Sequence, residues 1–153
     1  MTRWAGGFSV AAMAAITVTA FFPTAASAVP SSLASQAGGT AVNLKLTEKI
    51  RHGLADAFWK QYYREYHPAV SRNKVDGPKN VYYGKIKGAG AGKDVYWAVG
   101  FIGVKGNPIS YQDGPHVWRK RSHGSWSYRG DTGGCLAKVP RALLKIWRLP
   151  SCD

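Results

Sequence analysis

The chain has 153 residues and a formal net charge of +13, because 21 Lys and Arg face only 8 Asp and Glu. This length predicts one ordinary domain with a modest core and excludes large multidomain architectures. Most of the cations cannot be paired with acids of the same chain, so we expect a surface that attracts polyanions or acidic proteins. A charge that serves only solubility, without a specific partner, is the alternative.

Residues 1–28 have the pattern of a secretory signal peptide. Arg3 supplies a short positive region, an uncharged apolar run covers residues 8–22, and Ala26-Ser27-Ala28 is a small-x-small cleavage site. The run is too short and wrongly flanked for a membrane span. We therefore expect a secreted, extracellular protein that lacks a transmembrane segment and keeps all but one of its cations after cleavage.

Two cysteines, Cys135 and Cys152, remain after the predicted cleavage site. An oxidising destination and a single possible intramolecular pairing predict a disulfide between them. Closing a loop of this length is worth about 3 kcal/mol in the chain-entropy model. A pair of free thiols or an intermolecular bridge remains an alternative. The spacing gives no metal site, and the sequence predicts no cofactor.

The globular domain is expected over residues 44–153, after a flexible tail over residues 29–43 that is rich in Ser, Ala, Gly and Pro. Leu46 to Tyr66 is predicted as a helix, with Thr47 as its N-cap and Glu48 in the first turn. Its apolar residues recur at helical spacing; they are Ile50, Leu54, Ala57, Phe58 and Tyr62. On the polar side, Asp56 is within reach of Lys60 one turn later.

Strands are predicted at Asn80–Lys87, at Asp94–Val104, and in a hairpin over His116–Gly130, with residues 68–80 as a loop. The continuous apolar character of Asp94–Val104 indicates a central strand. Pro140 suits the start of a final helix that carries Leu143, Leu144 and Trp147. The expected fold is α+β: an N-terminal amphipathic helix on a small antiparallel sheet, with a short disulfide-clamped C-terminal helix.

A three-residue hairpin loop, Ser122-His123-Gly124 with Gly124 in the left-handed conformation, pairs Trp118 with Tyr128 and Lys120 with Trp126. A two-residue loop would shift this register and mix the two faces. The first register places three arginines opposite the aromatic rings, and two lysines alternate on a nearby strand. The predicted polyanion-binding residues are therefore Lys85, Lys87, Arg119, Arg121 and Arg129.

The leading hypothesis for the function is a non-enzymatic binding module. Its partner would be a polyanion (nucleic acid, a cell-wall polymer or an anionic surface) or an acidic protein. A small nuclease-like hydrolase is one alternative, with His116 and His123 beside the cations and with Glu65 or Asp113 as the base. An exported inhibitor or toxin-type protein is another.

The segment Gly130-Asp131-Thr132-Gly133-Gly134 looks like the Gly-Asp-Ser-Gly-Gly of trypsin-like proteases, with Thr132 in place of the nucleophile. Those enzymes need two β-barrels to assemble their catalytic groups, and this chain is too short for them. We interpret the segment as a glycine-rich turn.

The region from Tyr82 to Trp147 combines a Trp-bearing hairpin, this turn, a Val-Pro pair and a Leu-Leu-x-x-Trp helix. In this it resembles uncharacterised small secreted proteins of high-GC Gram-positive bacteria. The resemblance implies an exported single domain and implies no activity and no site residues.

Overall fold

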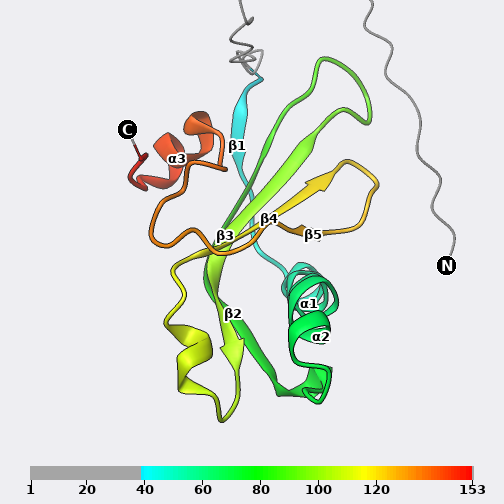
Figure 1. Cartoon of the computed structure of the whole chain (residues 1–153). Helices are drawn as coiled ribbons and strands as arrows, with labels where there is room; N and C mark the ends of the chain where they lie inside the picture. Colours follow the sequence, from blue (N-terminus) through cyan, green and yellow to red (C-terminus); the bar gives the residue numbers. More distant parts are fainter. Residues whose placement is uncertain (1–38, 153) are drawn as a thin grey trace, which may run out of the picture. The chain divides into compact units, whose positions relative to one another are not determined.

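The computed structural model describes residues 39–152, which contain a five-stranded antiparallel sheet (Figure 1). Each strand pairs with its neighbours in the chain, in the order β1-β2-β3-β4-β5. The strands are β1 (Ala41–Asn43), β2 (Val75–Ile86), β3 (Val95–Val104), β4 (His116–Arg121) and β5 (Ser127–Tyr128). Together with the helices described below, they confirm the α+β class.

The predicted signal peptide and most of the predicted tail lie outside the described residues. The tail's last residues differ from the prediction, because Ala41–Asn43 form the edge strand β1. The residues on either side of β1 are hydrogen-bonded to β2 and the residue after it. The Leu44 N–H donates to the Tyr83 carbonyl at 2.9 Å, and the Lys87 N–H donates to the Thr40 carbonyl at 3.0 Å. These pairings give order to a segment whose composition alone favours a flexible chain.

The long helix is confirmed and consists of three continuous parts. They are α1 (Glu48–Phe58), a π-helical turn η1 (Trp59–Tyr63) and α2 (Arg64–Tyr66). The Thr47 side chain caps α1 by accepting a hydrogen bond from the Ile50 N–H at 3.3 Å, as expected. Asp56, in contrast, pairs with Arg72 at 2.6 Å and not with Lys60. Arg72 begins the short 3₁₀ helix η2 (Arg72–Lys74), which the folded chain brings beside α1.

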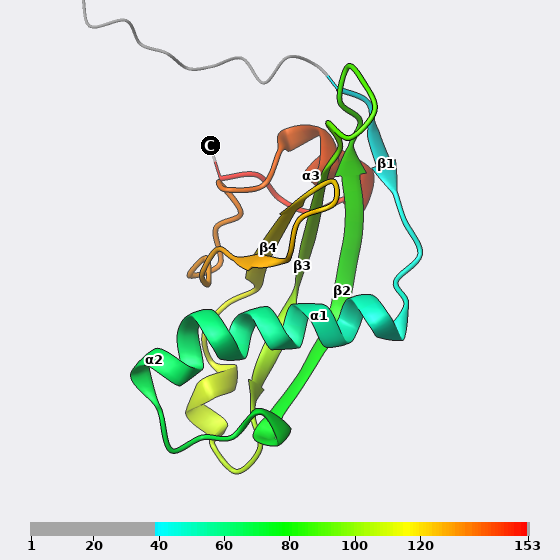
Figure 2. The ribbon, with the colours of Figure 1, turned by 90° about the vertical axis from the view of Figure 1, so that its right-hand side faces the viewer.

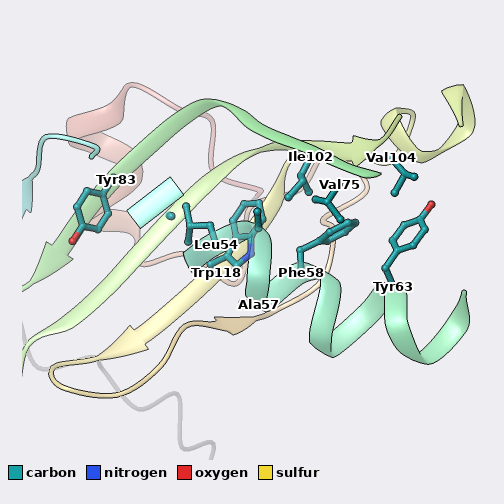
Figure 3. Close-up of a cluster of buried hydrophobic side chains, with 11 residues drawn as sticks. Leu54, Ala57, Phe58, Tyr63, Val75, Tyr83, Ile102, Val104 and Trp118 are labelled. Carbon is teal, nitrogen blue, oxygen red and sulfur yellow. The ribbon is translucent and has the colours of Figure 1, made fainter. Parts of the chain in front are cut away.

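One hydrophobic core lies between this helix and the sheet. Figure 3 shows Leu54, Phe58 and Tyr63 pointing from the helix toward strand residues that include Ile102 and Trp118. Leu54, Phe58, Ile102 and Trp118 are all 1 % exposed or less. Figure 2 shows α1 crossing β2 and β3 at a steep angle. The apolar stripe predicted from the sequence is thus the face that the helix buries.

A second core lies on the opposite face of the sheet, beneath α3 (Arg141–Trp147) (Figure 1). There, Leu143 and Trp147 pack against Trp97 and other β3 and β4 side chains. β3 is therefore central and buried on both faces, as its apolar run predicted. The Cys135–Cys152 disulfide is present, with an S–S distance of 2.03 Å, and it joins the segments before and after α3.

Two local predictions were wrong. β2 begins at Val75 and not at Asn80, because pairing with β3 continues through two irregularities, between Asp76 and Lys79 and between Lys79 and Tyr82. In the hairpin, the Trp118–Tyr128 pair is confirmed, but Gly124 is not left-handed and Trp126 lies outside the ladder. The turn is instead closed by the Gly124 N–H, which donates to the Arg121 carbonyl at 2.7 Å.

Candidate anion-binding face

Three arginines lie on the α3 side of the sheet, at the β4–β5 edge. The register places Arg119 opposite Trp97 and Arg121 opposite Val95, two residues that belong to the α3-side core or pack against it. Arg129 follows β5, and its N–H donates to the Val117 carbonyl at 2.8 Å. Since directly paired residues share a face, Arg129 lies on this side too. We call Arg119, Arg121 and Arg129 the arginine face.

Arg119 is the most enclosed of the three. Its guanidinium carbon lies 5.5 Å from the centre of the Trp97 ring, a cation–π arrangement. Its Nε–H is buried and has no hydrogen-bond partner among residues 39–152. Burial lowers the pKa of Arg119, and repulsion from Arg121 and Arg129 lowers it further. Arg121 and Arg129 are thus close enough to Arg119 for their positive charges to repel its guanidinium.

Acidic side chains in the described part of the chain do not neutralise this face. Within residues 39–152, no carboxylate lies within salt-bridge distance of the three guanidinium groups. The ion pairs described in this part of the chain lie elsewhere and include Glu48–Arg51, Asp56–Arg72, Asp76–Lys79 and Asp94–Lys85. The arginine face therefore offers uncompensated positive charge and forked donors that match the oxygens of phosphate, sulfate or carboxylate groups.

One of the two lysines predicted for the same surface, Lys85, lies elsewhere. Lys85 pairs with Tyr96 in the ladder, which places it on the α1 side of the sheet. Its Nζ donates to the Asp94 carboxylate at 2.6 Å, and this hydrogen bond raises the pKa of Lys85. Lys87 follows the end of β2 and lines a cavity with Lys93 and with Val95, the residue paired with Arg121. The structure thus corrects the expectation of five cations on one face.

Sequence reasoning missed two residues of this surface. Trp97 lies under Arg119 only because of the register between β3 and β4. No short turn fixes that register, since the two strands are joined by a long connection that includes the 3₁₀ helix η3 (Pro108–Tyr111). Lys138 lies in the segment before α3, and its Nζ donates to the Arg129 carbonyl at 2.9 Å. In the sequence, the only sign of the face on which Trp97 lies is its alternation with Tyr96 and Ala98 along the strand.

The histidines of the hydrolase alternative do not converge. His116 begins β4, while His123 follows its far end, and a strand of this length spans roughly 17 Å. His116 is 2 % exposed, and its Nδ1 shares a 2.7 Å hydrogen bond with the Tyr128 hydroxyl. Burial lowers the pKa of His116 and raises that of Tyr128, so both are neutral at pH 7. The buried His116 is therefore poorly placed for acid–base work on a substrate.

The Gly-Asp-Thr-Gly-Gly segment is a turn, as expected. The Thr132 hydroxyl donates to the Pro115 carbonyl at 2.9 Å, and the Cys135 N–H donates to the Thr132 carbonyl at 2.8 Å. The hydroxyl is therefore engaged in a structural contact.

Comparison with family models, curated proteins and solved structures finds no match for this chain. Among residues 39–152, no helix has both the length and the apolar character needed to cross a membrane.

Proposed function

We propose that this chain is an exported, non-enzymatic binding protein that holds polyanions on the arginine face. The observation that carries the proposal is the grouping of Arg119, Arg121 and Arg129 on one face, with no carboxylate of the described chain in salt-bridge distance. A ligand with regularly spaced phosphate or sulfate groups relieves the repulsion among the three guanidinium groups. It also releases its own counterions on binding.

Within this face, Arg119 and the two exposed arginines have different tasks. Trp97 holds the guanidinium of Arg119 in one orientation, which reduces the entropy lost when an anion binds. Arg121 and Arg129 reach solvent and supply further contacts along an extended ligand. The ligand class is therefore a polyanion, such as nucleic acid, an anionic cell-wall polymer or an anionic surface.

Export is part of the same proposal. The signal-peptide pattern of residues 1–28 motivates it. The Cys135–Cys152 disulfide is compatible with an oxidising compartment.

The test compares two variants that remove the same charge. Arg119, Arg121 and Arg129 are changed together to Gln in one variant, and the exposed Lys45, Lys49 and Lys60 are changed to Gln in the other. Binding to a short double-stranded DNA and to heparin is measured by fluorescence anisotropy. We expect the arginine variant to bind at least about tenfold more weakly than the lysine variant, because charge-assisted contacts are lost only in the first.

Equal weakening in both variants would show that only the total charge matters and would overturn the proposal. Circular dichroism of both variants checks that each remains folded.

A further inference from the structure

A row of paired residues crosses the α3 side of the sheet and ends at the arginine face. Ala41 pairs with Ile86, Ile86 pairs with Val95, and Val95 pairs with Arg121. Directly paired residues share a face of the sheet, and the three apolar members of this row pack against the α3-side core. The row therefore leads from aliphatic side chains to one of the three arginines.

This end of the α3-side core is not closed by α3 itself. Leu143 and Trp147 of α3 approach the sheet at Gly84, two residues before Ile86 along β2. Ile86 and Val95 are only half-buried. Figures 1 and 2 show the loop between β2 and β3 beyond the end of α3. The apolar face of the sheet thus continues past the helix that covers it.

A cavity of about 640 Å³ lies over this part of the sheet, a volume within the range of small-molecule sites. Its lining is mostly aliphatic, with two cations, and includes Thr40, Ile86, Lys87, Ala89, Lys93 and Val95. None of the lining residues that the structure describes carries an aromatic ring. A nucleic-acid base therefore lacks a stacking platform here, whereas an alkyl chain finds apolar side chains.

The charge around the cavity is positive. Lys87 and Lys93 are exposed lining residues, and Arg121 follows Val95 in the row across the sheet. The nearby carboxylate of Asp94 already has partners, because it accepts hydrogen bonds from Lys85 Nζ at 2.6 Å and from the loop N–H of residue 88 at 3.1 Å. An anionic group at the cavity is therefore attracted by three cations.

Hydrogen bonds hold the loop that borders the cavity. The Lys93 N–H donates to the Gly90 carbonyl at 3.1 Å, which closes a turn within the loop. The Ser122 N–H donates to the Asp94 carbonyl at 2.8 Å, which ties the start of β3 to the end of β4. The cavity is thus formed before a ligand enters, as is usual for small-molecule sites.

We propose that this cavity binds the alkyl chain of an anionic amphiphile, with the phosphate head group held by Arg121, Lys87 and Lys93. Burying each methylene strengthens binding by roughly two- to fourfold, and the cations select a negative head group. This inference goes beyond polyanion binding at the arginine face and shares only Arg121 with it.

The first arm of the test separates the chain from the charge. Isothermal titration calorimetry with the full chain compares butyl phosphate, octyl phosphate and the neutral octyl glucoside, all as monomers in solution. We expect octyl phosphate to bind at least about tenfold more tightly than either of the other two. Equal affinities of the two phosphates, or of octyl phosphate and octyl glucoside, would overturn the proposal.

The second arm assigns the chain to the cavity. Val95→Thr places a hydroxyl in the cavity with little change of shape. Val42→Thr makes the same change on the opposite face, where Val42 pairs with Lys85. We expect only Val95→Thr to weaken octyl phosphate binding, by about threefold or more, with butyl phosphate unaffected. Equal effects of the two threonine variants on octyl phosphate would contradict the proposal.

A second pair of variants lies on the exposed loop, so that the result does not depend on the stability of β3. Ala89→Asp adds a carboxylate to the cavity lining, and Ala91→Asp adds the same charge two residues further along. Octyl phosphate should bind several-fold more weakly to the first than to the second. Equal affinities would place the chain elsewhere. A missing chain-length effect overturns this proposal and leaves the DNA comparison of the two triple variants unchanged, so the two proposals fail separately.

Discussion

At the scale of single residues, Arg119 connects the core to the proposed binding surface. Its side chain rests on Trp97, a residue of the α3-side core, while its charge belongs to the arginine face. A guanidinium is planar and forked, so its stacking and its contacts with an anion use the same geometry. The ammonium group of a lysine at this position would keep the charge but could neither stack on the ring nor make forked contacts with an anion.

We therefore predict that Arg119→Lys weakens polyanion binding several-fold although the net charge is unchanged. The exposed Arg121 has no described ring beneath it, so Arg121→Lys should have a smaller effect. Fluorescence anisotropy with the same DNA measures both variants. Equal losses in the two would argue against a special role of the Arg119–Trp97 pair.

His116 predicts the pH dependence of stability. Burial lowers its pKa in the folded protein, so below pH about 6.5 the unfolded chain binds a proton that the folded chain does not. The stability that goes with keeping His116 neutral is fully present above that pH. As the pH falls below it, the free energy of unfolding decreases by at most about 1.4 kcal/mol per pH unit until the folded pKa is reached. Urea unfolding from pH 7.5 to 5 should therefore show a steeper loss for the wild type than for His116→Gln. Parallel curves would show that His116 does not titrate as its burial implies.

At the scale of elements, features set by local periodicity or by a tight turn could be predicted from the sequence. The helix and its Thr47 cap, the central apolar strand and the Trp118–Tyr128 pair are of this kind. Features that depend on long-range pairing could not. β1 is a strand only because β2 offers it an edge, and Lys85 was placed on the wrong face because the relation of β2 to β4 passes through β3.

The docking of α3 onto the sheet depends on a close approach at Gly84. A Cβ there would lie 2.7 Å from the Val42 carbonyl oxygen and 2.9 Å from Leu143 Cδ2. We predict that Gly84→Ala lowers the free energy of unfolding by about 1–3 kcal/mol, because backbone and a buried side chain must move. A Cβ at Gly90 would lie 3.9 Å from its nearest neighbouring atoms, so Gly90→Ala is the control. Equal urea midpoints for the two variants would show that α3 accommodates the extra methyl group without cost.

At the scale of the whole molecule, the excess of basic residues is not spread evenly over the described surface. The arginine face has no neutralising carboxylate among residues 39–152, whereas Lys85 is neutralised by Asp94. Net charge alone would attract any polyanion to any part of the surface. A binding site on the arginine face requires instead that most of the binding energy comes from these three arginines.

The most direct measurement is the salt dependence of DNA binding by the wild type and the two triple variants. Each lost cation–phosphate contact reduces the slope of log K against log salt by about 0.7–0.9. We expect the slope to become shallower by about two to three when Arg119, Arg121 and Arg129 are replaced by Gln, and to stay close to the wild-type value when Lys45, Lys49 and Lys60 are replaced. Equal slopes in the two variants would contradict a binding site on the arginine face.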